Sequence, residues 1–269
     1  MTSSLKSTLW WIFAVIFTIG IASYQRMTGP TYPTHGSVKI NSNSVKYNLI
    51  RTAETDKDAP ITITVPDNSV NATITYKRFK SNDTLTTAVM VRDGEKLTFM
   101  MPRQPAAGKM EYTVNLSDGK ETVAVTEHPV VMRFKGPVPF YILLPHILLM
   151  FLAMLFSTRA GIEALTKGKS TYLYALFTLI FFIPGGLILG PIVQKFAFGA
   201  YWTGWPFGHD LTDNKTALAV LGWVVAVIKL RKNPNARAWA IAAAIILLAV
   251  YMVPHSVLGS EIDYTQQPK

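Results

Sequence analysis

Apolar residues are gathered into five blocks along the chain instead of being spread evenly over it. The blocks comprise residues 9–22, 137–158, 171–193, 216–228 and 238–253. A helix rises roughly 1.5 Å per residue and the hydrocarbon core of a membrane is about 30 Å thick, so the second and third blocks are long enough to cross it. The first block lies between Lys6 and Arg26, and we expect residues 1–23 to form an uncleaved transmembrane anchor.

The fourth and fifth blocks are shorter. Trp223 and Lys229 allow the fourth to end at the membrane interface. The tight connection over residues 229–237 favours an antiparallel pair of helices. The pattern therefore predicts an α-helical integral membrane protein with about five transmembrane helices, the last four of which form a domain over residues 137–253.

Between the first two blocks, residues 24–136 are polar and rich in β-branched side chains that alternate with polar ones. This pattern, interrupted by turn residues, indicates short antiparallel strands. We expect strands over residues 37–47, 61–65, 71–79, 85–91, 97–101, 110–116 and 122–125. Several short strands in one segment predict an inserted all-β sandwich.

One stretch of this segment carries a resemblance to known modules. In residues 97–119, a corner with Pro102 and Pro105 precedes a predicted strand with Tyr112. This arrangement resembles the immunoglobulin-like or fibronectin-III-like modules of bacterial surface proteins. The resemblance covers about residues 37–134 and implies a sandwich fold, and it implies little about activity.

Basic residues on the short connections predict the orientation, because they remain mainly on the cytoplasmic side of a membrane. With the N-terminus inside, that side holds Lys6, Arg159, Lys167, Lys169, Lys229, Arg231, Lys232 and Arg237. Outside the β-rich segment, the opposite side holds Lys195, Lys215 and Lys269. We therefore expect a multi-pass protein of the cell (inner) membrane. Its β domain, a loop over residues 194–215 and a tail over residues 254–269 would face the periplasm or the exterior.

Composition narrows the function classes further. The chain has no cysteine, which excludes disulfides, thiolate metal sites and cysteine nucleophiles. Its formal charge of +10 is dispersed and agrees with membrane topology, so we predict no nucleic-acid partner. Nucleotide-binding glycine loops, Gly-x-Ser-x-Gly elbows and His-Glu-x-x-His motifs are absent from the sequence.

Histidines and carboxylates at the outer face are the main candidates for chemistry. The candidate cluster comprises His146, His209, Asp210, Asp213 and His255. Imidazole nitrogen and carboxylate oxygen together suit zinc or a similar ion, and a haem would need two facing histidines such as His146 and His255. The spacing matches no metal motif, so we predict no cofactor and keep a metal or haem site as an alternative. His146 either bonds a neighbouring helix or has a functional role.

The outer loop and the third helix contain two further unusual features. The loop carries four aromatic residues that would anchor helices or contact a partner: Tyr201, Trp202, Trp205 and Phe207. Asp213 is expected to cap the fourth helix. The third helix contains Pro184, Gly185 and Gly186, which should kink or open it.

Two functions remain from the sequence. The first is a non-catalytic membrane subunit that docks or positions a partner within a larger bacterial-type membrane complex through its sandwich. The alternative is a membrane-embedded redox or transport protein that uses a metal or haem at the outer face. The lipid bilayer and other membrane-protein subunits are the predicted partners.

Overall fold

The computed structural model describes residues 3–41, 43–254 and 261–266. Their contacts divide the chain into two compact units. Among the described residues, the helical unit comprises residues 3–30, 138–195 and 200–254. The β unit comprises residues 31–41, 43–137, 196–199 and 261–266. The structure shows helical segments on both sides of a separate β-sheet region, and residues 24–28, which were assigned to the β domain, belong to the first helix.

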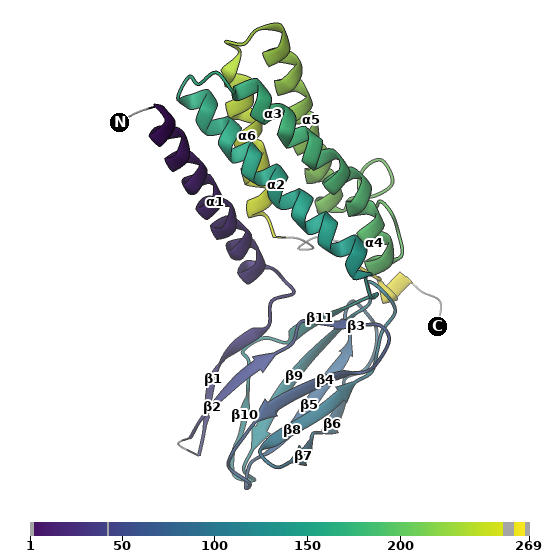
Figure 1. Ribbon diagram of the computed structural model, residues 1–269. Coiled ribbons are helices and arrows are strands. Elements are labelled where there is room, and N and C mark those ends of the chain that lie inside the picture. Colours follow the sequence, from purple (N-terminus) through teal and green to yellow (C-terminus); the bar gives the residue numbers. More distant parts are fainter. Residues whose placement is uncertain (1–2, 42, 255–260, 267–269) are drawn as a thin grey trace. The chain divides into compact units, whose positions relative to one another are not determined.

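The helical unit is built from long apolar helices (Figure 1). They are α1 (Ser3–Thr28), α2 (Phe140–Leu165), α3 (Thr171–Phe182), the π-helical segment η1 (Ile183–Leu189), α4 (Gly190–Phe198), α5 (Leu211–Lys232) and α6 (Arg237–Met252). The last three residues of α4 are counted with the β unit. Because α3, η1 and α4 follow one another without a gap, they form one continuous helix over residues 171–198.

Four of these helices are long and apolar enough to cross a membrane. The candidate spans are Leu5–Thr28, Phe140–Leu165, Thr171–Phe198 and Leu211–Lys232. The fifth predicted span, α6, is apolar but has only 16 residues. Helix α5 begins earlier than the predicted residue 216, because Asp210 caps a polar first turn that hydropathy alone does not reveal.

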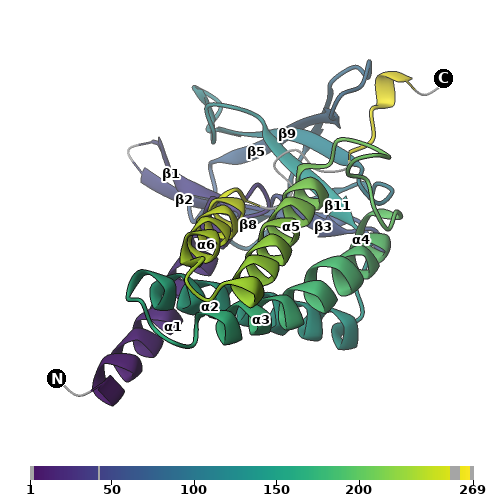
Figure 2. The same ribbon diagram turned by 90° about the horizontal axis from the view of Figure 1, so that it is seen from above.

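Small side chains allow the helices of this unit to approach closely. Helix α2 packs against α3 and α6, α5 packs against the same two helices, and α1 lies beside α2 and α6 (Figure 2). The buried small residues include Ala153, Ala160, Gly161, Ala164, Ala175, Ala219, Ala226, Ala240 and Ala243. Small side chains at the interface let the helix backbones come close together. The resulting van der Waals contact is the main attraction between helices in a membrane.

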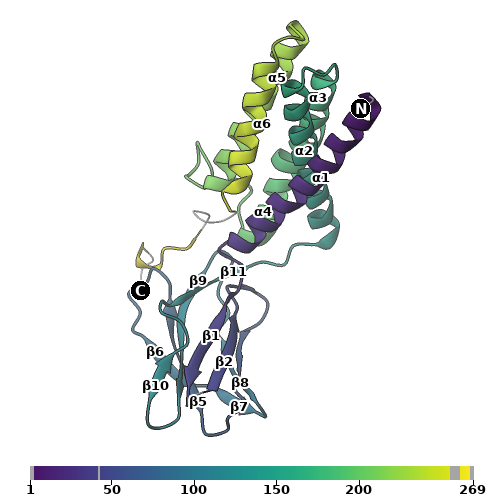
Figure 3. The same cartoon turned by 90° about the vertical axis from the view of Figure 1, so that its left-hand side faces the viewer.

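The strands of the β unit form three sheets. The bounds are β1 (Thr34–Ile40), β2 (Asn43–Leu49), β3 (Thr52–Glu54), β4 (Ala59–Thr64), β5 (Asn71–Arg78), β6 (Thr86–Val89), β7 (Val91–Asp93), β8 (Lys96–Met101), β9 (Lys109–Ser117), β10 (Thr122–Ala124) and β11 (Val130–Lys135). One sheet has the order β3-β11-β9-β5-β6, with β10 also paired to β9, and a second has the order β4-β8-β7. Strands β1 and β2 form an antiparallel pair (Figure 3).

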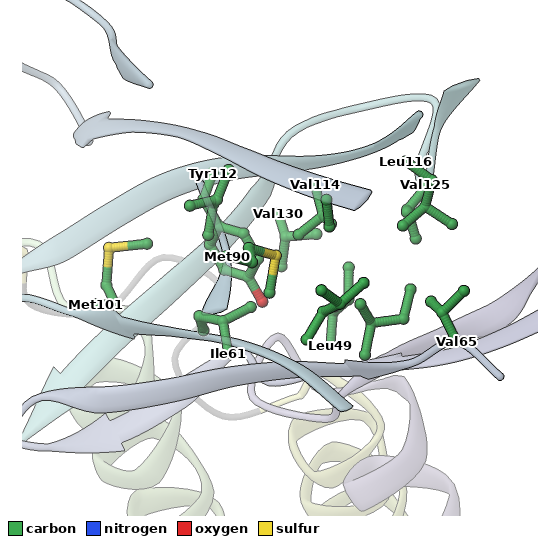
Figure 4. Packing of buried hydrophobic residues seen from close by; sticks show 14 of the residues in the cluster. Leu49, Ile61, Val65, Met90, Met101, Tyr112, Val114, Leu116, Val125 and Val130 are labelled. Carbon is green, nitrogen blue, oxygen red and sulfur yellow. The ribbon is translucent and has the colours of Figure 1, made fainter. Parts of the chain in front are cut away.

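Apolar side chains from these sheets meet in one core. Ile61 of β4 and Met101 of β8 face Tyr112 and Val114 of β9 across it (Figure 4). All four side chains are buried, and burial of a large aliphatic side chain contributes about 1.5–3 kcal/mol. Regular alternation explains the arrangement, because every second residue of β9 is buried from Met110 to Leu116. The β-rich domain is thus confirmed, and its immunoglobulin likeness stays a prediction.

The structure differs from the strand predictions in three places. Residues 37–47 form no single strand, because the chain reverses between β1 and β2, where Asn41 adopts a left-handed conformation with φ of 50°. The segment after His128 was not expected to be a strand, yet β11 lies between β9 and β3. The predicted strand over residues 85–91 is divided between β6 and β7, which belong to different sheets.

Candidate functional site

The irregular part of the predicted outer loop is shorter than residues 194–215. Helix α4 extends through Phe198 and α5 starts at Leu211, so the aromatic loop comprises residues 199–210. Three of its four aromatic residues are strongly exposed, led by Trp205 at 77% and Phe207 at 82%, followed by Tyr201. Trp202 is half-buried, and its indole Nε1 donates a hydrogen bond to the Trp205 carbonyl at 3.1 Å.

The base of the aromatic loop is organised by Asp213, which is buried. Its Oδ2 accepts hydrogen bonds from the backbone N–H groups of Thr203 (2.6 Å) and Gly204 (3.0 Å), and from Gln194 Nε2 at 3.2 Å. The expectation that Asp213 is the helix cap was wrong. Asp210 is the N-cap, and its Oδ1 accepts from the Thr212 N–H at 2.8 Å. Asp213, one turn further, is therefore available to hold the loop.

Close backbone packing fixes the loop on the first turn of α5. A Cβ atom on Gly204 would lie 2.6 Å from the Asp213 Cβ, and one on Gly208 would lie 2.4 Å from the Thr203 carbonyl oxygen. Asn214 Oδ1 accepts from the Trp205 N–H at 2.7 Å. Both glycines are thus needed for close approach, and the result is a polar, hydrogen-bonded base that presents exposed aromatic rings.

The candidate metal ligands do not form a metal-binding group in the described part of the chain. No three His, Asp or Glu side chains among those residues are arranged to hold an ion. His209 is exposed, whereas Asp210 and Asp213 are buried and bonded to the loop. His255 lies outside the described residues, so the pairing with His146 that a haem would need is not tested.

His146 contacts the third candidate span, Thr171–Phe198. Its Nδ1 lies 2.9 Å from the Gly185 carbonyl oxygen. Because a carbonyl only accepts, Nδ1 carries the proton, and Nε2 is the ring atom left for any other partner. This is the helix-to-helix hydrogen bond that the sequence allowed as one of two roles for His146.

A small cavity adjoins His146 between α1, α2 and α6. It has a volume of about 180 Å³, and Thr18, Gln25 and Tyr251 also line it. Gln25 Nε2 donates to the Tyr251 carbonyl at 2.9 Å, and the buried Thr18 hydroxyl has no partner among the described residues. Pockets for drug-sized ligands measure roughly 300–1,000 Å³, so this cavity suits only a molecule of a few atoms.

The predicted break at Pro184, Gly185 and Gly186 is a π-helical segment within a continuous helix. The Gly190 N–H donates to the Gly185 carbonyl five residues back, as in a π-turn. A Cβ atom on Gly185 would lie 2.9 Å from the Leu149 Cβ, and one on Gly186 would lie 3.0 Å from Thr216 Cγ2. The two glycines therefore permit close contact with α2 and α5, and the helix widens there without opening.

Sequence reasoning treated Arg159 only as a topology signal, but the structure buries it. Arg159 is 2% exposed, and its Nη1 lies 2.7 Å from Glu163 Oε2. The guanidinium lies 4.8 Å from the centre of the Tyr174 ring and 5.6 Å from that of Trp11. The sequence did contain a signal for this ion pair. Arg159 and Glu163 are four residues apart on one helix, and side chains at that spacing lie next to each other.

A second unpredicted cluster ties the C-terminal segment to the β unit. Glu261 forms ion pairs with both Lys80 and Lys109. Burial opposes ionisation of Glu261, but the hydrogen bonds from Lys109 and Lys80 outweigh it and lower the pKa of this carboxyl. The two lysines respond differently: the bond to Glu261 raises the pKa of Lys80, whereas burial lowers the pKa of Lys109. We attribute the difference to exposure, because the Lys109 side chain is much less exposed than that of Lys80.

Tyr264 extends this attachment. Its backbone N–H donates to the Lys80 carbonyl at 3.0 Å, and the Arg78 guanidinium lies 4.5 Å from the centre of its ring. Arg78 also pairs with Asp83, whose pKa the hydrogen bond lowers to about 2. The described tail is therefore held on the β unit by a small network of charges.

These residues form four separate arrangements: the aromatic loop on Asp213, the His146 contact with Gly185, the buried Arg159–Glu163 pair, and the charged attachment of the tail. None of the four by itself identifies a reaction. Comparison of the chain with protein-family models, curated proteins and solved structures gives no match.

Proposed function

We propose that the chain is a non-catalytic integral membrane subunit that positions a partner protein through its β unit. The observation that carries this proposal is an uncharged edge formed by β6, the residues that flank it, and Val91 at the start of β7. Val89 and Val91 are 71% and 72% exposed, and the neighbouring Leu85 is also strongly exposed. We call residues 85–91 the open edge.

The open edge lies at the end of both larger sheets. Strand β6 pairs only with β5, and β7 only with β8, among the described strands. Soluble edges are normally protected by charged residues or proline, because their free N–H and C=O groups can pair with another chain. Residues 85–91 contain neither, and the first charged residues beyond them are Arg92 and Asp93 at the end of β7. An extended apolar segment of a partner could add a strand there and cover the exposed valines.

Contacts of the tail support the proposed topology. Residues 261–266 bond to the β unit, which supports a topology in which the tail and the β unit share one side of the membrane. The chain between them must then cross an even number of times. Helices α2, α3–α4 and α5 supply three candidate spans, so α6 is required as the fourth. Its 16 residues cover roughly 24 Å at 1.5 Å per residue, which local thinning of the bilayer accommodates.

The end of α4 supports the same arrangement. The Gly136 N–H donates to the Ala197 carbonyl at 2.9 Å, and the Arg133 guanidinium lies 5.4 Å from the centre of the Phe198 ring. The chain just before the aromatic loop is thus attached to the β unit. We propose that the aromatic loop, the β unit and the tail all face the periplasm or exterior, and that the N-terminus is cytoplasmic.

Mild solubilisation of the tagged full chain tests the partner directly. We expect another membrane-complex subunit to co-purify with the wild type, and Val89→Lys to abolish its retention because lysine protects a sheet edge. Met100→Lys is the matched control, since Met100 is also an exposed apolar residue of the β unit but lies on β8, an internal strand. Equal loss in both variants, or recovery of only a second copy of this chain, contradicts the proposal.

Single-cysteine labelling tests the topology without background, because the natural chain has no cysteine. Lys169→Cys should react only from the cytoplasm, and Phe207→Cys only from the opposite side. Labelling of both from one compartment would overturn the arrangement. Stoichiometric metal or a haem absorption band in the purified protein, lost in His209→Ala, would instead favour the metal or haem alternative.

A further inference from the structure

A groove opens on the helical unit between the start of α1 and the end of α2. Its volume is about 800 Å³. Lys6, Ser7, Arg159 and Glu163 line its polar part. Leu9, Trp10 and Phe13 line its apolar part, and all three side chains are exposed within the unit. The groove therefore has a charged end and an apolar wall.

Arg159 supplies a fixed cation at the charged end. It is buried, paired with Glu163, and held between the rings of Tyr174 and Trp11. Its Nη2 lies 3.5 Å from Ser7 Oγ of α1, and its Nε has no hydrogen-bond acceptor among the described residues. A buried donor without an acceptor is costly, and guanidinium groups are well suited to phosphate oxygens.

The charges of the groove are not balanced. Lys6 and Arg159 contribute two positive charges, and Glu163 contributes one negative charge, which leaves one positive charge unmatched. A ligand with one negative charge would complete the site. The apolar residues lie on α1 within the candidate span Leu5–Thr28, so the same ligand needs an apolar chain that lies beside them in the membrane.

We propose that this groove binds an anionic phospholipid, with its headgroup phosphate at Lys6 and Arg159 and one acyl chain along Leu9, Trp10 and Phe13. A free phosphate would satisfy only the charged end. A neutral lipid would satisfy only the apolar wall. The site is distinct from the open edge, and it would tie α1 to α2 at the end opposite the aromatic loop.

Native mass spectrometry of the full chain in detergent tests the proposal with phosphatidylglycerol and phosphatidylcholine as probes. We expect the wild type to retain phosphatidylglycerol preferentially. Lys6→Gln should reduce that preference about fivefold, the value expected for one basic residue near an anionic lipid surface. Lys6 is exposed, so this variant is expected to fold normally. Arg159→Gln should reduce the preference further, but Lys6→Gln remains decisive if that variant is unstable.

Lys232→Gln is the matched control, since Lys232 is exposed and lies at the end of α5, away from the residues that line the groove. It should leave the preference unchanged. A second arm adds inorganic phosphate, which should not displace the bound lipid. Equal retention of the two lipids by the wild type, an equal effect of Lys232→Gln, or displacement by inorganic phosphate would refute the lipid site. None of these results bears on partner retention at the open edge.

Discussion

Replacement of Asp213 by alanine should release the aromatic loop while the helices remain folded. The substitution removes the acceptor of the Thr203 and Gly204 N–H groups, which lie 2.6 and 3.0 Å from Asp213 Oδ2. A buried donor that loses its acceptor costs about 1–3 kcal/mol. Two such donors give about 2–6 kcal/mol. Since Thr203 is only half-buried, water replaces part of the loss there, and we expect about 2–4 kcal/mol.

Hydrogen exchange measures this local change. The protection of an amide falls tenfold for each 1.4 kcal/mol, so the Thr203 and Gly204 amides should exchange roughly 30- to 700-fold faster in Asp213→Ala. Asp213→Asn keeps one side-chain oxygen as an acceptor but loses the charge, and it should give a smaller increase. Asn214→Ala is the matched control, because it removes only the acceptor of the Trp205 N–H.

Unchanged exchange at Thr203 and Gly204 in Asp213→Ala would refute the role assigned to this carboxylate. An equal increase throughout α5 would also contradict it, because the effect would then be a loss of helix stability and not an opening of the loop. In the expected case, quenching of tryptophan fluorescence should increase as well, since Trp202 loses the Trp205 carbonyl that positions it.

Two further predictions concern the β unit. Tyr112→Phe removes the hydrogen bond from the buried hydroxyl to the Ile50 carbonyl at 2.8 Å, and should destabilise the β unit by about 1–2 kcal/mol, measured by denaturation followed by circular dichroism; an unchanged midpoint would contradict this. Because the pKa of Glu261 is lowered on folding, its ion pairs stabilise the attached tail above the ordinary value of 4.5 and lose this effect as the pH falls below it. Protease cleavage after Lys80 or near residue 261 should therefore increase below that pH, and Glu261→Gln should show the increase already at pH 7; cleavage that does not change with pH would rule this out.

The apolar blocks predicted the helices well, because hydropathy depends on local composition. Their ends were less predictable. Residues 212–215 are polar, and residues 211–215 were assigned to a loop, but Asp210 caps them into the first turn of α5. The capping signal was present in the sequence, and it was read one turn too late, at Asp213. The actual role of Asp213 depends on Thr203 and Gly204, which reach it only through the folded loop.

In the β unit, the error at β1 and β2 was avoidable. The inward positions are even-numbered before the turn, as at Ile40, and odd-numbered after it, as at Val45 and Leu49. A regular strand keeps its parity, so this switch indicated that the strand is interrupted between Ile40 and Val45. By contrast, β11 follows His128 and Pro129 with little alternation, since Met132, Arg133 and Phe134 are all buried. Its strand character arises from pairing on both sides, which local sequence does not encode.

The π-helical segment has a consequence for the length of the third membrane helix. A π-turn takes about one residue more than an α-turn, and one residue corresponds to roughly 100° of rotation about the axis. The extra residue in the π-helical segment Ile183–Leu189 therefore sets the rotation of α4 about its axis. That rotation in turn determines the direction in which Gln194 points toward Asp213. An insertion or deletion in this segment would rotate Gln194 away from Asp213 and so alter the base of the aromatic loop. The number of residues in the helix is therefore constrained, as well as its hydrophobicity.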